Sequence, residues 1–314
     1  MSNEIELKFQ INNCDIADLQ SFLNQWASSD ELEFSSLSNN QRTFSTLSLC
    51  NCYYDTADNY LRNHHCGLRL RVTESNESKQ YEMTLKRDSH AIAGLHERTE
   101  YNVDLSCPQL DLSLFPVGVF PNNCDIEKLQ KNLQPLFTTN FTRQVWLISF
   151  ANSEIEVALD LGKITSNGKF KPIQEVELEI KQGNKQDLIN FAIELSRFNL
   201  HLFSQSKASR GYRLLLNKPV TSELFSAQIE QDLPNLLNFW QQNEEYALEN
   251  NDFIYYKQLL IQINEVLINL NLQIEPDFEQ WQMAIQRIDS IAKFAYSEVN
   301  TKLKLKLISE INGI

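Results

Sequence analysis

Short segments in which apolar and charged residues strictly alternate recur through the first 218 residues of this chain. The earliest is Glu4-Ile5-Glu6-Leu7-Lys8, and later ones surround Arg69, Glu82, Glu156 and Glu177. Because successive side chains of a β-strand point to opposite faces, each segment predicts a strand with one apolar and one ionic face. A fold built from such strands must cover the apolar faces and supply counter-charge to the ionic ones.

The charges on these faces are sorted by sign. Residues two apart lie on the same face of a strand, about 6.6 Å from each other at a rise of about 3.3 Å per residue, so like charges repel there. Clustered carboxylates favour a hard divalent cation, Mg²⁺ or Mn²⁺, whereas paired arginines favour phosphate. The strands therefore predict a barrel whose ionic interior holds a metal polyphosphate. The sorted clusters are Glu4 and Glu6; Arg69 and Arg71; and Glu175, Glu177 and Glu179.

Helical spacing appears twice within the strand-rich part, over residues 16–26 and 185–197, and dominates the chain after residue 218. We interpret residues 1–218 as an α+β domain, an eight-stranded antiparallel β-barrel with flanking helices. Residues 219–314 are predicted to form a small α-helical bundle of about three helices, separated near Pro234 and Pro276.

Composition narrows the classes of partner. The 28 Lys+Arg against 41 Asp+Glu give a net charge of -13, which argues against broad binding to nucleic acid or to a membrane surface. No apolar run approaches the length of a membrane span, and the six cysteines include no C-x-x-C pair. We therefore expect free thiols and a cytoplasmic location. Lys302, Lys304 and Lys306 are interpreted as a solvated face.

The ionic segments together resemble the CYTH superfamily, the triphosphate tunnel metalloenzymes. Glu4-Ile5-Glu6-Leu7-Lys8 matches the E-x-E-x-K opening of that superfamily, and companion motifs follow it in family order. These companions are Tyr53-Tyr54-Asp55-Thr56, Gly67-Leu68-Arg69-Leu70-Arg71, Thr84-Leu85-Lys86, His96-Glu97-Arg98-Thr99-Glu100-Tyr101, Phe141-Thr142-Arg143, Ile155-Glu156-Val157-Ala158-Leu159-Asp160, Glu177-Leu178-Glu179 and Ser206-Lys207-Ala208-Ser209-Arg210-Gly211-Tyr212. The pattern is most similar to bacterial inorganic triphosphatases that carry a CHAD-type helical domain after the CYTH domain. Here the helical part is short, and all five histidines lie at or before His201.

The resemblance implies a tunnel enzyme that hydrolyses inorganic triphosphate (tripolyphosphate) with Mg²⁺ or Mn²⁺. The implied metal ligands are Glu4, Glu6, Asp160, Glu177 and Glu179. The implied phosphate contacts are Lys8, Arg69, Arg71, Lys86, Arg143 and Lys207, together with Arg210 in a supporting position. Further supporting roles fall to Arg98, Glu100, Glu156 and Glu175. The catalytic set would be Glu4, Glu6 and Lys8, with the attacking water activated by a bound metal or, alternatively, by Lys8 as the base.

Other functions on the same fold stay open. A thiamine triphosphatase, a nucleoside or RNA triphosphatase and an adenylyl cyclase would share much of the ionic set. A second class is a non-catalytic module that binds triphosphate or polyphosphate, with the C-terminal helices contacting a protein or a polyphosphate chain. The carboxylates favour the enzyme, because uncompensated acids in a pure anion site would repel phosphate.

Overall fold

The structure is a computed structural model of the chain. It describes residues 2–28, 45–75, 78–92, 94–121, 124–226, 229–230, 232–270, 272, 274 and 276–313, excluding the side chains of residues 2, 3, 28, 88–92 and 98. The strands are β1 (Ser2–Gln10), β2 (Ser45–Asp55), β3 (Cys66–Glu74), β4 (Lys79–Ile92), β5 (Leu95–Leu105), β6 (Gln134–Phe150), β7 (Ser153–Ser166), β8 (Lys169–Gln182) and β9 (His201–Leu202). The α-helices are α1 (Ile16–Ser28), α2 (Tyr60–Asn63), α3 (Ile126–Asn132), α4 (Lys185–Leu195), α5 (Lys207–Leu215), α6 (Leu233–Asn250), α7 (Phe253–Leu270), α8 (Asp277–Ile285), α9 (Ile291–Ala295) and α10 (Glu298–Ile311). Two 3₁₀ turns are η1 (Leu112–Leu114) and η2 (Ser196–Phe198).

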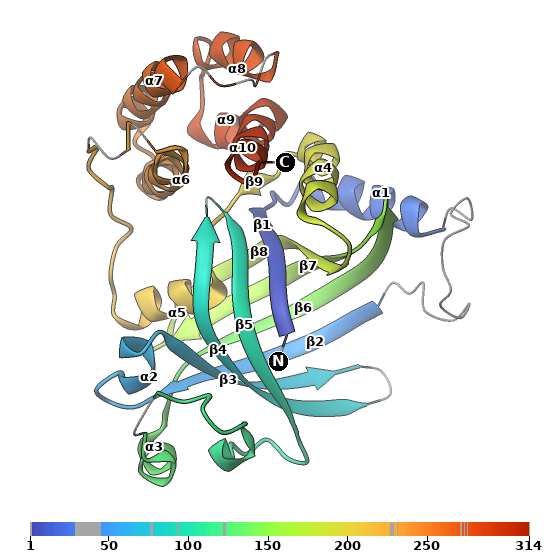
Figure 1. Cartoon of the computed structure of the whole chain (residues 1–314), viewed down its shortest axis with the longest axis vertical. Coiled ribbons are helices and arrows are strands. Elements are labelled where there is room, and N and C mark those ends of the chain that lie inside the picture. The colour runs from blue at the N-terminus through green and yellow to red at the C-terminus, as the bar shows by residue number, and fades with distance from the viewer. Residues whose placement is uncertain are drawn as a thin grey trace.

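The long strands form a closed antiparallel barrel. Their order is β5-β4-β3-β2-β6-β7-β8-β1-β9, and an additional pairing of β1 with β5 completes the ring of β1 to β8. Strand β1 makes that closure: Leu7 is paired with Leu178 of β8 on one side and with Leu95 of β5 on the other. Closure leaves no free edge along most of the sheet. The predicted eight-stranded antiparallel barrel is thus confirmed (Figure 1).

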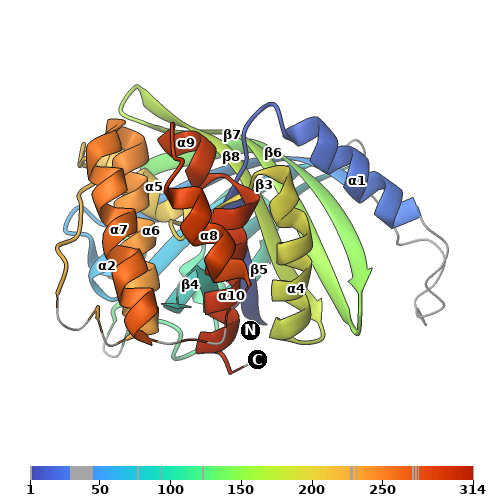
Figure 2. The same cartoon turned by 90° about the horizontal axis from the view of Figure 1, so that it is seen from above.

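Alternation along each strand separates the two faces of the barrel. On β1, Leu7 and Phe9 are fully buried in a large apolar core outside the barrel, whereas Glu6 and Lys8 face its interior. Helices α1 and α4 supply part of that core through residues such as Leu23. The C-terminal helices supply the rest, and Figure 2 shows α7, α6, α10, α4 and α1 spread across one end of the molecule. The apolar faces are therefore covered by helices, as the sequence predicts.

Helix α5 packs directly against the barrel wall and delivers one residue to its interior. Ser206 is the N-cap, and its side chain accepts a hydrogen bond from the Ser209 amide. Gly211 allows the close approach, because a Cβ at this position would lie 2.1 Å from the Phe137 ring of β6. The first residue of the helix, Lys207, is buried and lines the barrel cavity.

The C-terminal part has five helices among its described residues, rather than three. Pro234 lies in the first turn of α6 and Pro276 is the N-cap of α8, so each proline begins a helix rather than dividing one. The additional breaks lie before α7, before α9 and before α10, and none is marked by proline. Asn251, in the left-handed conformation, ends α6, and the N-caps Ser290 and Ser297 begin α9 and α10. The boundary at residue 218 stays a prediction, although the chain is extended just after it.

A buried charge network joins these helices to the barrel. Glu244 of α6 accepts hydrogen bonds from Tyr256, Asn300 and Lys304, on α7 and α10, and lies 3.0 Å from His201 Nε2 of β9. Burial alone would raise the pKa of Glu244, but Lys304 and His201 hold it at about 2. The interpretation of Lys304 as a solvated side chain is therefore wrong, because it is fully buried as the partner of this carboxylate.

Candidate active site in the barrel

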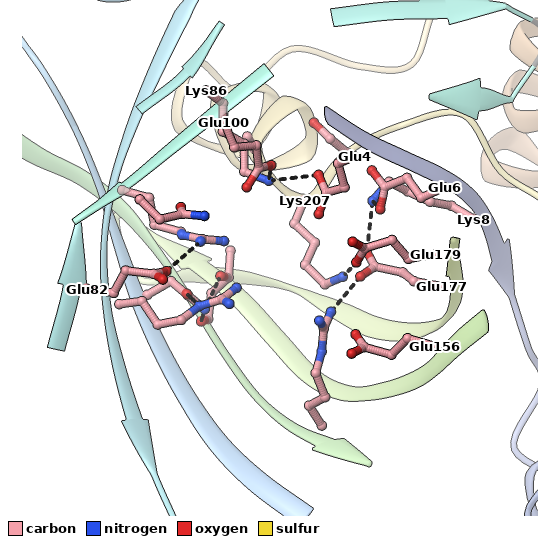
Figure 3. Close-up of a pocket in the computed structure, with 18 of the residues that line it drawn as sticks. Glu4, Glu6, Lys8, Glu82, Lys86, Glu100, Glu156, Glu177, Glu179 and Lys207 are labelled. Carbon is pink, nitrogen blue, oxygen red and sulfur yellow. Dashed lines mark hydrogen bonds and ion pairs between the residues drawn. The ribbon is translucent and has the colours of Figure 1, made fainter. Parts of the chain in front are cut away.

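The ionic faces enclose a cavity of about 510 Å³ inside the barrel. Seven carboxylates and seven cationic side chains face it, so without a ligand the lining is electrically balanced. In Figure 3 these side chains converge on one space from opposite walls. The charged lining residues are Glu4, Glu6, Lys8, Arg69, Arg71, Glu82, Lys86, Glu100, Arg143, Glu156, Glu177, Glu179, Lys181 and Lys207.

Strand register explains the contacts on the wall formed by β1 and β8. Lys8 is paired with Glu177 across these strands, and Glu6 with Glu179. The ammonium of Lys8 accordingly lies 2.9 Å from a Glu177 oxygen, and it reaches Glu6 on its own strand at 2.8 Å. Lys8 therefore separates two carboxylates that would otherwise repel each other.

Lys207 enters this wall from α5 and is surrounded by three carboxylates. Its Nζ lies 2.7 Å from Asp160, 2.7 Å from Glu175 and 2.8 Å from Glu177. Although burial opposes the charge, Asp160 and Glu177 raise the pKa of Lys207, and Lys207 in turn helps to hold the pKa of Glu177 well below its usual range. The ligand oxygens of these three acids lie within 4.8 Å of one another, a spacing that could hold a metal ion.

Arg143 of β6 contacts Asp160 and Glu177, two of the carboxylates that also bind Lys207. It faces Asp160 in the β6–β7 register and binds it with two hydrogen bonds of 2.7 Å, a forked geometry. A second contact reaches Glu177. Burial disfavours the cation, but Asp160 and Glu177 raise the pKa of Arg143 well above its usual value. Asp160 is thus already neutralised by Arg143 and Lys207.

The opposite wall is basic and carries less counter-charge. Arg69 donates to Thr84 at 2.8 Å and lies 3.3 Å from Glu82, its one ion-pair partner among the described residues. Arg71 donates to the amide oxygen of Asn51 at 2.7 Å and forms no ion pair among the described residues. Burial, with Arg69 and Arg143 nearby, lowers the pKa of Arg71 to about 9. An anion that bound here would supply the missing charge.

Lys86 and Glu100 bridge the two walls. They are paired in the β4–β5 register and their side chains are in contact, while Lys86 also lies 3.6 Å from Glu4. Although burial favours protonation, Lys86 and Arg69 hold the pKa of Glu100 down to about 2. Lys86 is therefore shared between an acid of β5 and the first acid of β1.

Glu179 marks the place where negative charge exceeds positive charge. Its one ion-pair partner among the described residues is Lys181 at 2.9 Å, and Lys181 is also shared with Glu156 at 3.3 Å. Burial raises the pKa of Glu179 to about 7, and the nearby Glu4 and Glu156 add to the effect against the pull of Lys181. Carboxylate oxygens with too little counter-charge fit a hard divalent cation.

The structure places most of the predicted site residues around the barrel cavity and two of them outside its lining. Asp160 is fully buried behind Arg143 and Lys207, outside the cavity lining. Arg210 points elsewhere, to a second cavity described below. The side chain of Arg98 lies outside the described residues. The remaining predicted metal and phosphate residues all line the barrel cavity; their roles stay predictions.

Sequence reasoning missed five polar lining residues, Asn51, Glu82, Asn102, Thr139 and Lys181. Each could have been found by extending the period-two pattern of a strand already recognised. Glu82 shares the inner face with Lys86, and Lys181 continues the face of Glu179. Asn51 carries no charge, so its only signal was its place in a strand; it holds Arg71 and donates to the Thr139 carbonyl at 2.9 Å.

Comparison with known proteins agrees with this geometry. The family model described as the CYTH domain matches residues 2–212. This chain belongs to the CYTH domain family. A protein of Haemophilus influenzae called inorganic triphosphatase is 32% identical over 275 residues, which cover 84% of this chain and 71% of that protein. The predicted family membership is confirmed, whereas the family match ends before α6, so the CHAD-like assignment of the helices stays a prediction.

Solved structures of more distant proteins also align with the chain. A Hippeastrum protein, HpAC1, described with a dominant triphosphatase activity, is 16% identical with a TM-score of 0.45 and covers 69% of this chain and 97% of its own. The Pyrococcus horikoshii protein PH1819 is 16% identical with a TM-score of 0.42, covering 69% of this chain and 99% of its own. Among the described residues of the present chain, no helix has the length and apolarity needed to cross a bilayer.

Proposed function

We propose that this CYTH-family chain is a metal-dependent inorganic triphosphatase that cleaves tripolyphosphate to pyrophosphate and phosphate. The observation that carries the proposal is a closed barrel whose lining has equal numbers of acidic and basic side chains. Arginines with few carboxylate partners on one wall face carboxylates with few cationic partners on the other. A polyanion accompanied by a divalent cation satisfies both walls at once. The relative from Haemophilus influenzae, called inorganic triphosphatase, supports the same activity.

The basic wall would bind and orient the phosphate chain. Phosphoryl transfer needs neutralised oxygens and an aligned water more than it needs covalent help from the protein. Arg69 and Arg71 lie on one strand with their guanidinium groups at the cavity, so they can bind successive phosphates. Lys86 and Lys207 would contact the same chain from the bridging strand and from α5. Arg143, already bound to Asp160, would present its remaining donors to the substrate.

The carboxylates of β1 and β8 would hold the metal ion. Glu4, Glu6 and Glu179 offer oxygen donors, and Glu179 shares its ion-pair partner Lys181 with Glu156. Asp160 fits this role less well, because Arg143 and Lys207 already neutralise it. A bound Mg²⁺ or Mn²⁺ would polarise phosphate oxygens and lower the pKa of a coordinated water.

Lys8 would position the acid wall rather than act as a base. Its ammonium donates to Glu6 and Glu177, the arrangement of a cation that fixes two carboxylates. Its remaining donor capacity can reach a phosphate oxygen in the cavity it lines.

The lining favours inorganic triphosphate over substrates that carry an organic group. Within the described part of the chain, Tyr53, Phe141, Ile180 and Ala208 are the only apolar or aromatic residues that line the cavity; the rest are charged or polar. Nucleobase and thiazolium rings bind preferentially to apolar and aromatic surfaces. Thiamine triphosphatase, nucleoside triphosphatase and adenylyl cyclase activities are therefore the alternatives against which the assay should discriminate.

The test is phosphate release from tripolyphosphate, pyrophosphate, ATP and thiamine triphosphate, each with Mg²⁺, Mn²⁺ or EDTA. The Glu4→Gln/Glu6→Gln variant should lose turnover, because the substitution keeps side-chain size and removes two metal ligands. Glu127→Gln, an exposed acid on α3, is the matched control and should be fully active. Isothermal titration with Mn²⁺ checks separately that the double variant has lost metal affinity.

Selective, metal-dependent cleavage of tripolyphosphate that disappears in Glu4→Gln/Glu6→Gln would support the proposal. Tight tripolyphosphate binding with no turnover under any metal would contradict it and favour a binding module. Faster cleavage of ATP or thiamine triphosphate would mean that the chain is a triphosphatase whose preferred substrate carries an organic group.

A further inference from the structure

A second cavity, of about 720 Å³, lies where the barrel meets the C-terminal helices. We term it the junction cavity. Its barrel side comes from β8, α5 and the extended residues after α5, and its helical side comes from α6 and from Ala292 and Tyr296 near α9. Both sides place charged residues on it: Lys171, Arg210, Arg213 and Lys218 from the barrel side, and Glu245 and Glu249 from α6.

Two arginines of α5 form the deep part of the junction cavity. Arg210 and Arg213 are one helical turn apart and therefore lie on the same face of the helix. The guanidinium of Arg210 stacks on the Phe203 ring at 5.1 Å and donates weakly to the Pro172 carbonyl at 3.3 Å. Arg213 donates to Gln205. Two guanidinium groups that line one cavity from the same helix face offer planar sets of donors to a tetrahedral oxyanion.

Glu175, a buried carboxylate outside the lining of the junction cavity, contacts Arg210, whereas the acids that line the cavity add little counter-charge. Glu249 is exposed at the rim and is paired with Lys171, whereas Lys218 is exposed with no ion pair among the described residues. Glu245 is nearly buried, and its Oε1 has no hydrogen-bond partner there. Burial raises the pKa of Glu245 to about 8 against the opposing pull of Arg213 and Arg210, so at neutral pH this acid is protonated and does not repel an anion.

We propose that the junction cavity is a second anion site, which binds inorganic phosphate or pyrophosphate between Arg210 and Arg213, with Lys218 at the entrance. The helix α5 thus serves two cavities. Lys207 at its first position faces the barrel interior, and Arg210, three residues later, faces the junction. This division accounts for a basic residue that the sequence motif groups with the active site and that the structure directs away from it.

A single carboxylate connects the two cavities. One oxygen of Glu175 lies 2.7 Å from Lys207, and its other oxygen contacts Arg210. If an anion accepted the hydrogen bonds of Arg210, Glu175 would lose that cationic partner and would interact with Lys207 alone. Lys207 would then be held more firmly among its carboxylates and would bind substrate phosphate less well. This inhibitory coupling, unlike the binding site itself, rests on the proposed function.

Binding is tested on the full chain by isothermal titration with orthophosphate and with pyrophosphate in the presence of EDTA. The wild type should show two classes of site. Arg213→Gln/Lys218→Gln should retain the barrel site and weaken the junction site about tenfold or more, as expected for lost charge-assisted hydrogen bonds. Arg71→Gln/Lys86→Gln should do the reverse. Lys257→Gln, an exposed cation of α7, is the control.

A milder variant guards against misfolding. Lys218→Glu changes only an exposed side chain, so it should fold normally and still weaken the junction site severalfold. If both junction variants titrate like the wild type, the site does not exist. If the wild type shows a single class that only Arg71→Gln/Lys86→Gln removes, the proposal is likewise overturned.

Coupling is tested by product inhibition. Added orthophosphate should raise the KM for tripolyphosphate in both proteins by competition in the barrel. The wild type should show a further rise, which Arg213→Gln/Lys218→Gln should reach only at about tenfold more phosphate, in step with its lost affinity. Unchanged inhibition in that variant would contradict the coupling. If the wild type cleaves no triphosphate but the junction variants still lose binding at the junction cavity, the proposed function is wrong and the second anion site is supported. The two failures are therefore distinguishable.

Discussion

At the scale of single residues, several buried charges of this chain are held by neighbouring backbone or side-chain groups. Asp55, at the end of β2, is an instructive case outside the cavity. Its fully buried carboxylate accepts hydrogen bonds from the backbone amides of Thr56, Leu61 and Arg62 at 2.8–3.0 Å. It therefore fixes the short helix α2, which is too short to be stable by itself.

Asp55→Asn should lower the free energy of unfolding by about 2 kcal/mol, because the amide group loses charge-assisted acceptance and leaves buried donors poorly satisfied. Urea denaturation followed by circular dichroism measures the change. Asp104→Asn, on an exposed position of β5, is the matched control and should be neutral. Equal stability of Asp55→Asn and wild type would show that the three amides find water instead.

Glu245 predicts a dependence of stability on pH. Its pKa is about 8 in the folded chain against an ordinary value of 4.5, so between these values the folded state holds a proton that the unfolded state releases. Stability then falls as pH rises through this range, by at most about 1.4 kcal/mol per pH unit. Glu245→Gln has no proton to lose, so its melting temperature relative to wild type should be higher at pH 8 than at pH 5. A difference independent of pH would contradict the assignment.

At the scale of elements, the barrel depends on how closely α5 approaches β6. Gly211→Ala would place a Cβ 2.1–2.6 Å from three atoms of the Phe137 ring, so we expect the helix to shift. Overpacking of this kind costs about 1–3 kcal/mol, and a shift of α5 also moves Lys207. We expect a lower melting temperature and a higher KM for tripolyphosphate.

The control for this substitution is Gly67→Ala on β3, where a Cβ would meet nothing within 4 Å. That variant should match the wild type in both measurements. Wild-type kinetics in Gly211→Ala would mean that the ring of Phe137 rotates away and α5 stays in place.

A strand or helix was predictable from the sequence where the periodicity of apolar and charged residues within that segment was enough to identify it. The period-two alternation identified the ionic strands and, through the sign of their charges, most of the cavity lining. It could not show that Arg210 turns away from Lys207, because a shared motif says nothing about which neighbour faces each side of a helix. Nor could it show that Lys304 is buried, since the partner carboxylate is 60 residues away in the chain. Serine caps without proline concealed the starts of α9 and α10.

At the scale of the whole molecule, the C-terminal helices and the barrel share one core. Apolar residues of β1, α4, α6 and α10 belong to a single cluster. Figure 2 shows the helices that contribute to it. Within this core the Glu244 network joins β9 to three helices. The two parts should therefore unfold together rather than as independent domains.

Lys304→Met tests this cooperation. The substitution keeps side-chain volume but leaves Glu244 with uncompensated charge, so the free energy of unfolding should fall by about 3 kcal/mol. Lys302→Met, whose partner Asp277 is near the surface, should cost about 1 kcal/mol or less. Calorimetry of the wild type should give one transition, and a stable barrel signal after the helices melt would refute the shared core.

The closure of the barrel by β1 has a consequence for the order in which the molecule can be assembled. This strand must find β5, about 90 residues further along the chain, and β8, about 170 residues further. Until both have been synthesised, Lys8 lacks its partner Glu177, and Leu7 lacks both of the residues with which it pairs, Leu95 and Leu178. A ribosome-bound intermediate would therefore expose an unpaired, half-apolar strand, the kind of segment that chaperones protect. Catalytic competence would arise late, with the ring itself.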